Sequence, residues 1–103
     1  MAGGPLQGVR ILDLTAVVVG PMATQTLADY GAEVIKVETP GGDILRDLNG
    51  RAVTPKMSSK FLHLNRNKRS LVLDLKQHAG REALLKLAAR ADVFLWNVRP
   101  SAM

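Results

Sequence analysis

The fold is decided by residues 9–38, which read VRILDLTAVVVGPMATQTLADYGAEVIKVE. Residues 9–15 are short and almost wholly apolar, as expected of a strand covered on both faces. A turn at residues 16–20 and a helix from Pro21 to about Tyr30 should follow, because Pro suits the first turn of a helix and Gly31 suits its carboxyl end. Residues 33–38 are partly alternating and β-branched, which predicts a second strand.

A strand, a helix and a strand in this order form a βαβ unit whose strands are parallel neighbours. Residues 70–75 and 92–97 predict two further strands, and residues 76–80 a loop between the third strand and a helix. The apolar positions of that helix recur at helical spacing, and they are Leu84, Leu87, Ala88 and Ala91. Residues 56–65 predict a short helix and residues 44–55 a loop. The sequence therefore predicts an α/β fold, an open parallel sheet of about four strands with helices on both faces.

Composition limits the class of protein. The 103 residues are 47% hydrophobic and 22% charged, which indicates one folded domain over residues 1–103 and excludes a disordered chain or a fibre. There is no cysteine, so disulfides and thiolate chemistry are excluded. No apolar run approaches the length a bilayer requires, and residues 1–5 do not resemble a signal peptide. We expect a cytoplasmic protein that does not enter a membrane.

The net charge of +5 is concentrated between residues 51 and 69. This block contains six Lys and Arg residues, with no acid between Asp47 and Asp74. It favours an anionic partner such as nucleic acid or a polyphosphate cofactor. Only one aromatic residue, Phe61, lies within it, so a stacking platform for single-stranded nucleic acid has little support. A basic module that binds nucleic acid remains the alternative.

Candidate chemistry is expected beyond the carboxyl ends of the strands, where parallel sheets bind ligands. The turn at residues 15–21 has one glycine and three valines, which excludes a dinucleotide fingerprint, and no P-loop is present. The free N–H groups at the start of its helix can still receive part of a large cofactor. His63 and His78 lack ligand-spaced neighbours, which argues against a metal site. We interpret Asp13 and Asp74, inside apolar strands, as structural.

Several blocks of the sequence, in the same order, resemble the family III CoA-transferases, the group of carnitine dehydratase and bile-acid-inducible protein F. They are residues 6–15, 20–21, 27–38, 42–43, 46, 65–76, 80, 91–93 and 97–100. Together they cover nearly the whole chain. The resemblance implies a Rossmann-like sheet, incomplete relative to the family fold, in a dimeric enzyme whose substrates are an acyl-CoA and a carboxylic acid.

Carried over position by position, the resemblance implies a set of CoA contacts. They are Val17, Val18, Val19, Leu73, Lys76, Asn97 and Val98. The three valines match the lining of the CoA pocket, the next two residues match the adenosine and phosphate end, and the last two flank the pantetheine and the thioester. A lysine suits the phosphate end because its ammonium is a compact, mobile charge.

Departures from the family pattern narrow the substrate. Val18 stands where formyl-CoA transferases have a glutamine, and it cannot donate a hydrogen bond to an oxyanion, which disfavours a small oxalate-like acid. Thr39 stands where some relatives place an arginine against the adenine, and Ser101 replaces a glycine. The run Asn65-Arg66-Asn67-Lys68 favours a transferase over an acyl-CoA racemase of the same family.

The family resemblance also implies a nucleophile, a downstream aspartate that attacks the thioester and becomes an aspartyl-CoA intermediate. None of the aspartates in this chain matches it. We therefore expect a CoA-binding amino-terminal part of a CoA-transferase, inactive alone, that forms a homodimer or associates with another chain. A structural or regulatory fragment that pairs with a full-length relative is the remaining alternative. In either case we expect apolar surface at the edge of the sheet.

Overall fold

The computed structural model describes residues 4–43, 46 and 59–97. In this part of the chain strands and helices alternate: β1 Arg10–Leu14, α1 Val19–Asp29, β2 Glu33–Glu38, α2 Ser59–Leu64, β3 Arg69–Val72, α3 His78–Ala89 and β4 Val93–Trp96. The strands form one parallel sheet in the order β3-β2-β1-β4. The predicted α/β class, the parallel βαβ unit and the four strands are confirmed.

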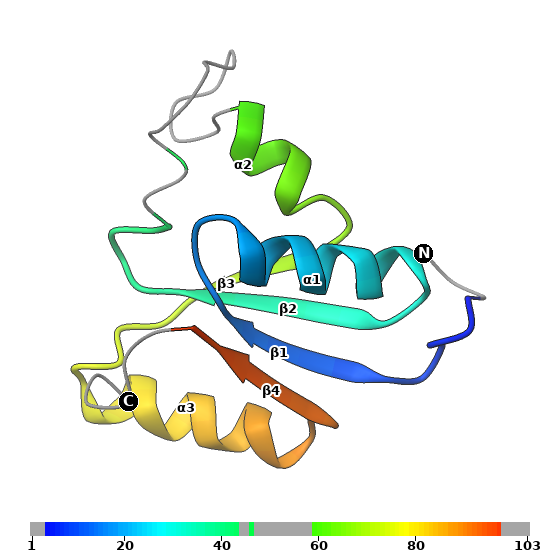
Figure 1. The fold of residues 1–103 in the computed structure, drawn as a ribbon. Coiled ribbons are helices and arrows are strands. Elements are labelled where there is room, and N and C mark those ends of the chain that lie inside the picture. Colours follow the sequence, from blue (N-terminus) through cyan, green and yellow to red (C-terminus); the bar gives the residue numbers. More distant parts are fainter. Residues whose placement is uncertain (1–3, 44–45, 47–58, 98–103) are drawn as a thin grey trace.

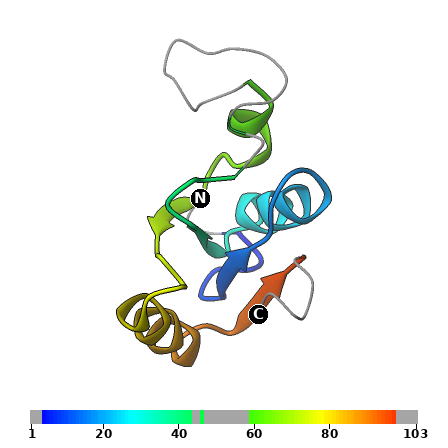
Figure 2. The same cartoon turned by 90° about the vertical axis from the view of Figure 1, so that its left-hand side faces the viewer.

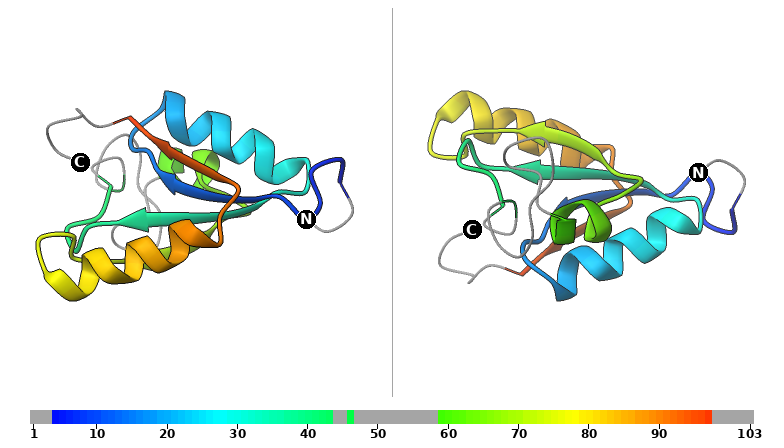
Figure 3. Two further views of the ribbon diagram at one scale, coloured as in Figure 1. Left: turned by 90° about the horizontal axis from the view of Figure 1, so that it is seen from below. Right: turned by 90° about the horizontal axis from the view of Figure 1, so that it is seen from above.

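The helices cover both faces of the sheet, α1 and α2 on one face and α3 on the other (Figures 1 and 3). In Figure 2 the sheet lies between α3 and the face that carries α1. The chain runs from β1 to β2 in one direction across the sheet and from β3 to β4 in the opposite direction. Because such crossovers are right-handed, the reversal moves the connecting helix to the opposite face. It also creates a switch point between β1 and β4, beyond whose carboxyl ends ligands bind in sheets of this kind.

Alternate side chains of β1 build two apolar cores. Ile11 points toward α1 and packs with Ala28 and Val34, all of them buried. Leu12 points to the other face and packs with Val37 and the half-buried leucines of α3. Burial on both faces explains why β1 is nearly continuous in apolar residues rather than alternating.

The ends of α1 combine one confirmed signal with one displaced boundary. The helix begins at Val19 rather than at Pro21, so Pro21 occupies its third position. A proline is tolerated there because the first amides of a helix have no intrahelical acceptor. Gly31 has a φ of 106°, which confirms the predicted left-handed residue just beyond the helix.

β3 and α3 differ from their predicted bounds. β3 covers Arg69–Val72 instead of residues 70–75, because its partner β2 ends at Glu38, which is paired with Val72. α3 begins at His78, so part of the predicted loop at residues 76–80 is helical. Gly80 lies in that first turn, where a Cβ would stand 2.0 Å from the carbonyl oxygen of Asp74. The close contact, which no local pattern reveals, lets the helix start early.

The remaining predictions concern single elements. α2 confirms the short helix predicted within residues 56–65, and β4 confirms the strand predicted at residues 92–97. The predicted loop at residues 44–55 lies outside the described residues except for Arg46. None of the described helices has the length and apolar character needed to cross a membrane.

Apolar side chains are exposed along both edges of the sheet. Val72 on β3 is 56% exposed, and Val93 and Trp96 on β4 are 39% and 46% exposed. Within the described part of the chain, each of these strands pairs with one neighbour only. The expected apolar surface at the sheet edge is confirmed.

Candidate functional site

The turn between β1 and α1, residues 15–18, lies at the carboxyl end of β1, and side chains hold its backbone. The N–H and the hydroxyl of Thr15 both donate to Asp13 Oδ1, the former at 2.9 Å. Lys36 Nζ donates to the carbonyl oxygen of Thr15 at 3.0 Å. The N–H of Val17 donates to both carboxylate oxygens of Asp43, each at 3.2 Å. Side chains thus fix the path of the turn where the sheet ladder has ended.

Asn97, at the end of β4, fixes the middle of the same turn. The N–H of Ala16 donates to Asn97 Oδ1 at 3.0 Å, and Asn97 Nδ2 donates back to the Ala16 carbonyl oxygen at 2.9 Å. Both backbone groups of Ala16 are therefore satisfied by one side chain. This pair of hydrogen bonds joins the ends of β1 and β4 at the switch point of the sheet.

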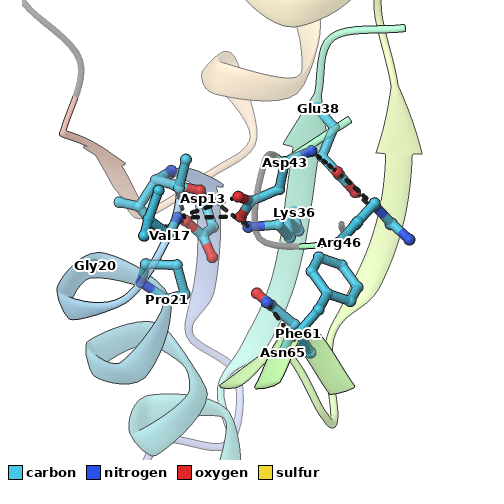
Figure 4. A network of polar contacts seen from close by, with 12 residues as sticks. Asp13, Val17, Gly20, Pro21, Lys36, Glu38, Asp43, Arg46, Phe61 and Asn65 are labelled. Carbon is cyan, nitrogen blue, oxygen red and sulfur yellow. Dashed lines mark hydrogen bonds and ion pairs between the residues drawn. The ribbon is translucent and has the colours of Figure 1, made fainter. Parts of the chain in front are cut away.

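Behind the turn lies a buried ionic network, made of Asp13, Lys36, Glu38, Asp43, Arg46 and Lys68 (Figure 4). Lys36 pairs with Asp43 at 3.1 Å, and the two side chains are 2% and 1% exposed. Glu38 accepts hydrogen bonds from Arg46 at 2.6 Å and 2.8 Å and from the Asp43 N–H at 2.6 Å. Buried charges persist only when they are paired and hydrogen-bonded in this way. The network thus anchors the loop after β2 beside the turn after β1.

Phe61 of α2 forms the apolar wall of this network. Its ring is 5% exposed, and the guanidinium carbon of Arg46 lies 3.9 Å from the ring centroid. Lys36 Nζ lies 5.8 Å from the same centroid. Both cations are within the range of a cation–π contact. α2 therefore shields the charges that support the turn.

Lys68 is a functional residue that the sequence pattern misplaced. Its ammonium donates to Asp13 Oδ2 at 3.0 Å, to the Pro21 carbonyl oxygen at 3.1 Å and to Asn65 Oδ1 at 2.8 Å. The side chain is 1% exposed, so its assignment to a solvated basic block is wrong. Asp13 carried the signal that was missed, because an acid in a strand covered on both faces needs a buried donor.

The ionisation of these groups follows from their surroundings. Burial raises the pKa of Asp13, but hydrogen bonds from Thr15 and Thr24 and the charge of Lys68 lower this pKa more, to below its usual range. Burial likewise raises the pKa of Glu38, and the contacts from Arg46 and the Asp43 N–H bring this pKa below its ordinary value. Burial lowers the pKa of Lys68, which the charge of Asp13 opposes. Three oxygens around its ammonium indicate that the pair is ionic at neutral pH.

The carboxyl edge of the sheet is hollowed at two places. A hollow of about 180 Å³ lies between the ends of β1 and β2, with Thr15, Ala16 and Asp43 in its lining. A second, of about 320 Å³, lies between the ends of β2 and β3. A larger hollow of about 450 Å³ lies at the opposite edge, around the starts of β2 and β3. We place the site at the carboxyl edge, because parallel sheets bind their ligands there.

The sequence matches the model of one protein family, described as CoA-transferase family III, over residues 6–103. The chain belongs to CoA-transferase family III. Its relatives include the succinyl-CoA:glutarate CoA-transferase of Mus musculus, 49% identical over 100 residues that cover 96% of this chain and 23% of the relative. The formyl-CoA:oxalate CoA-transferase of Streptomyces coelicolor is 45% identical over 108 residues that cover 100% of this chain and 25% of that protein.

Solved structures agree with this assignment to CoA-transferase family III. The orthorhombic crystal structure of Rv3272 from M. tuberculosis has a TM-score of 0.88 and 43% identity, covering 100% of this chain and 29% of that one. A CAIB/BAIF family protein from Brucella suis has a TM-score of 0.87 and 38% identity, covering 96% of this chain and 27% of that one. The resemblance stated from the sequence is confirmed. The chain spans about a quarter of the length of the relatives it matches.

The structure places the family-derived contact residues along one edge of the sheet. Val17, Val18 and Val19 lie in the turn and at the start of α1, and the first and third are 37% and 80% exposed. Asn97 is joined to this turn by hydrogen bonds. Lys76 is exposed beyond β3 at the same edge. These segments, far apart in the sequence, therefore share one surface.

Two of the family-derived positions stand apart. Leu73 is half-buried and packs against Leu12, Leu14 and Val37, so much of its side chain belongs to the core under α3. Val98 lies outside the described residues. Among the residues that are described, no three His, Cys, Asp or Glu side chains are grouped as a metal site requires.

Proposed function

We propose that this chain forms the CoA-binding part of an acyl-CoA:carboxylate CoA-transferase, which moves CoA from an acyl-CoA to a free carboxylic acid. One observation carries the proposal: Asn97 bonds to both backbone groups of Ala16, which joins two of the predicted contact segments at the switch point. Family membership and the placement of Lys76 at the same edge support it.

The strand order gives the direction of the bound cofactor. Neighbouring strands lie about 4.8 Å apart, so a ligand that reaches from the end of β3 to the end of β4 extends over about 15 Å. We place the phosphates near Lys76 and the thioester near Asn97 and Val98. The pantetheine then crosses the hollows at the ends of β2 and β1 and meets the exposed side chains of Val17 and Val19.

The chemistry needs a carboxylate that can reach the thioester. In the proposed reaction an aspartate attacks the thioester carbonyl and expels CoA as a thiolate, which then attacks the resulting anhydride to give an aspartyl-CoA and the free acid. Asp13 and Asp43, which adjoin the turn, are buried in ion pairs and are not placed to do this. We therefore assign the reacting aspartate to a segment outside this chain. Val18 offers no side-chain donor to an oxyanion, so we propose an acceptor other than a small oxalate-like acid.

The exposed apolar edges support a second part of the proposal, association with another copy or another chain. Val72, Val93 and Trp96 leave more apolar surface at the ends of the sheet than a lone small domain needs. We expect gel filtration to show a species larger than one chain. A strictly monomeric chain that binds no apolar dye would contradict this part.

Titration of the chain with CoA by calorimetry tests the binding function. We expect measurable affinity, which Lys76→Ala lowers about five-fold through the loss of a charged phosphate contact worth about 1 kcal/mol. Lys86→Ala on α3 is the matched control, an exposed lysine away from the carboxyl edge. No binding by a folded sample at millimolar CoA, or equal loss in both variants, would overturn the proposal.

A further inference from the structure

Val17 adopts a backbone conformation that its residue type resists. Its φ is +73°, in the left-handed region, where a β-branched residue is rare because Cβ crowds the backbone. Such a conformation costs free energy and persists only where the surrounding structure imposes it. Packing does not impose it here, since Val17 is 37% exposed.

The contact that does impose it comes from Asp43. Both of its carboxylate oxygens accept from the Val17 N–H at 3.2 Å, and the carboxylate itself is 1% exposed. It cannot turn away, because Lys36 pairs with it at 3.1 Å and its own N–H donates to Glu38 at 2.6 Å. A buried carboxylate held on three sides is therefore aimed at one strained amide (Figure 4).

The strained residue lies where it sets the shape of the proposed site. Val17 stands just before α1, whose first residue follows Val18 and whose start has no side-chain cap hydrogen bond. Asp43 also lines the hollow between the ends of β1 and β2, opposite Thr15 and Ala16. The same contact thus fixes the turn, the direction of the first amides of α1 and one wall of the hollow.

We propose that Asp43 is a positioning residue for the CoA site: it holds Val17 in the left-handed conformation and so presents the turn and the start of α1 to the cofactor. The positioning of CoA rests on the function proposed above, whereas the hold on Val17 does not. Asp43 touches no reacting atom in this proposal. It acts through the backbone of the turn.

Stability measurements test the strain without any ligand. Val17→Gly and Val17→Ala both remove the two methyl groups, but only glycine adopts a φ of +73° without steric cost. We expect a higher unfolding midpoint in urea for Val17→Gly than for Val17→Ala. An equal or higher midpoint for Val17→Ala would show that the turn is not held under strain and would overturn the proposal, even if variants of Asp43 fail to fold.

Amide exchange then tests the role of Asp43. We expect Asp43→Asn to raise the exchange rate of the Val17 amide at least ten-fold, because one acceptor oxygen and the charge are lost. Glu82→Gln on α3 removes an acid from an exposed position and should leave this rate unchanged. An unchanged Val17 rate in Asp43→Asn would refute the proposed hold.

A rescue experiment connects the hold to the cofactor. Asp43→Asn should weaken CoA binding ten-fold or more, but three-fold or less in the Val17→Gly background, where the turn no longer resists its conformation. Equal loss in both backgrounds would mean that Asp43 supports the fold generally and does not position the turn. If the unsubstituted chain binds no CoA, the proposed function fails, while the exchange and stability results still decide the hold on Val17.

Discussion

The Nζ atom of Lys68 lies 3.0 Å from Asp13 Oδ2, and the two side chains are 1% and 0% exposed. Asp13 uses its other oxygen to accept from the N–H and hydroxyl of Thr15, the first residue of the β1–α1 turn. The loop before β3 is thereby connected through one carboxylate to the turn after β1. The ion pair is part of the support of the proposed site as well as of the core.

Removal of Lys68 should be strongly destabilising. Lys68→Met leaves the Asp13 carboxylate buried without its cation, and we expect a loss of about 3–5 kcal/mol in the free energy of unfolding. Urea denaturation at neutral pH measures this loss. Lys86→Met, at an exposed position on α3, should change it by less than about 0.5 kcal/mol.

A second substitution keeps this prediction testable. Asp13→Asn added to Lys68→Met removes the uncompensated charge, so the double variant should lose less than the sum of the single losses. A loss below about 1 kcal/mol in Lys68→Met, or strict additivity in the double variant, would show that the pair is not the constraint that the structure indicates.

Stability should fall at acid pH in a direction fixed by the carboxylates. The pKa values of Asp13 and Glu38 are lowered in the folded chain, so between the folded and unfolded values the unfolded chain binds more protons. Their contribution is therefore present above about pH 4, the usual range of free carboxyls, and is lost as the pH falls through the folded values. Urea denaturation at a series of pH values from 7 to 2 measures this slope.

Glu38→Gln provides the control for the pH series. It removes one of the two titrating groups, so the variant should be less stable than the original chain at pH 7 and closer to it at pH 2. Parallel curves for the two proteins would argue that the Glu38 carboxylate contributes nothing to the acid dependence.

The sequence predicts the elements well where local pattern decides them. The bounds of β2 follow from its β-branched residues, and the end of α1 follows from Gly31, because both signals lie within a few residues. The start of α3 depends instead on the contact of Gly80 with the backbone of Asp74. The end of β3 depends on where its partner strand stops. Such boundaries are set by tertiary contacts that local spacing does not encode.

The support of the site lies further beyond reach of the sequence. Lys68 and Asp13 are 55 positions apart, and Asn97 and Ala16 are 81 apart. Neither pair has a periodic signal, and a lysine in a basic run gives no sign that it is buried. The family resemblance identified the turn and Asn97 as sharing a ligand, but only the strand order shows that they are hydrogen-bonded neighbours.

Asn97 should be sensitive to the loss of either half of its amide. Asn97→Ala removes both hydrogen bonds to Ala16, and Asn97→Asp keeps the acceptor but loses the donor to the Ala16 carbonyl oxygen. We expect the free energy of unfolding to fall by about 1 kcal/mol in each variant, since Asn97 is exposed to solvent. CoA affinity, measured by calorimetry, should fall more in Asn97→Ala than in Asn97→Asp. Affinity unchanged in both variants would separate Asn97 from the binding site.

Gly20 should resist a substitution that helix propensity favours. Alanine is the better helix former by about 1 kcal/mol, yet a Cβ at Gly20 would stand 2.4 Å from the Cβ of Thr15. Gly20→Ala must therefore move α1 away from the turn, and we expect it to lower the free energy of unfolding by about 1–3 kcal/mol and to weaken CoA binding. Gly41→Ala is the matched control, because a Cβ there meets nothing within 4 Å. If Gly20→Ala proves as stable as Gly41→Ala in urea and binds CoA equally well, the close approach of α1 to Thr15 does not shape the site.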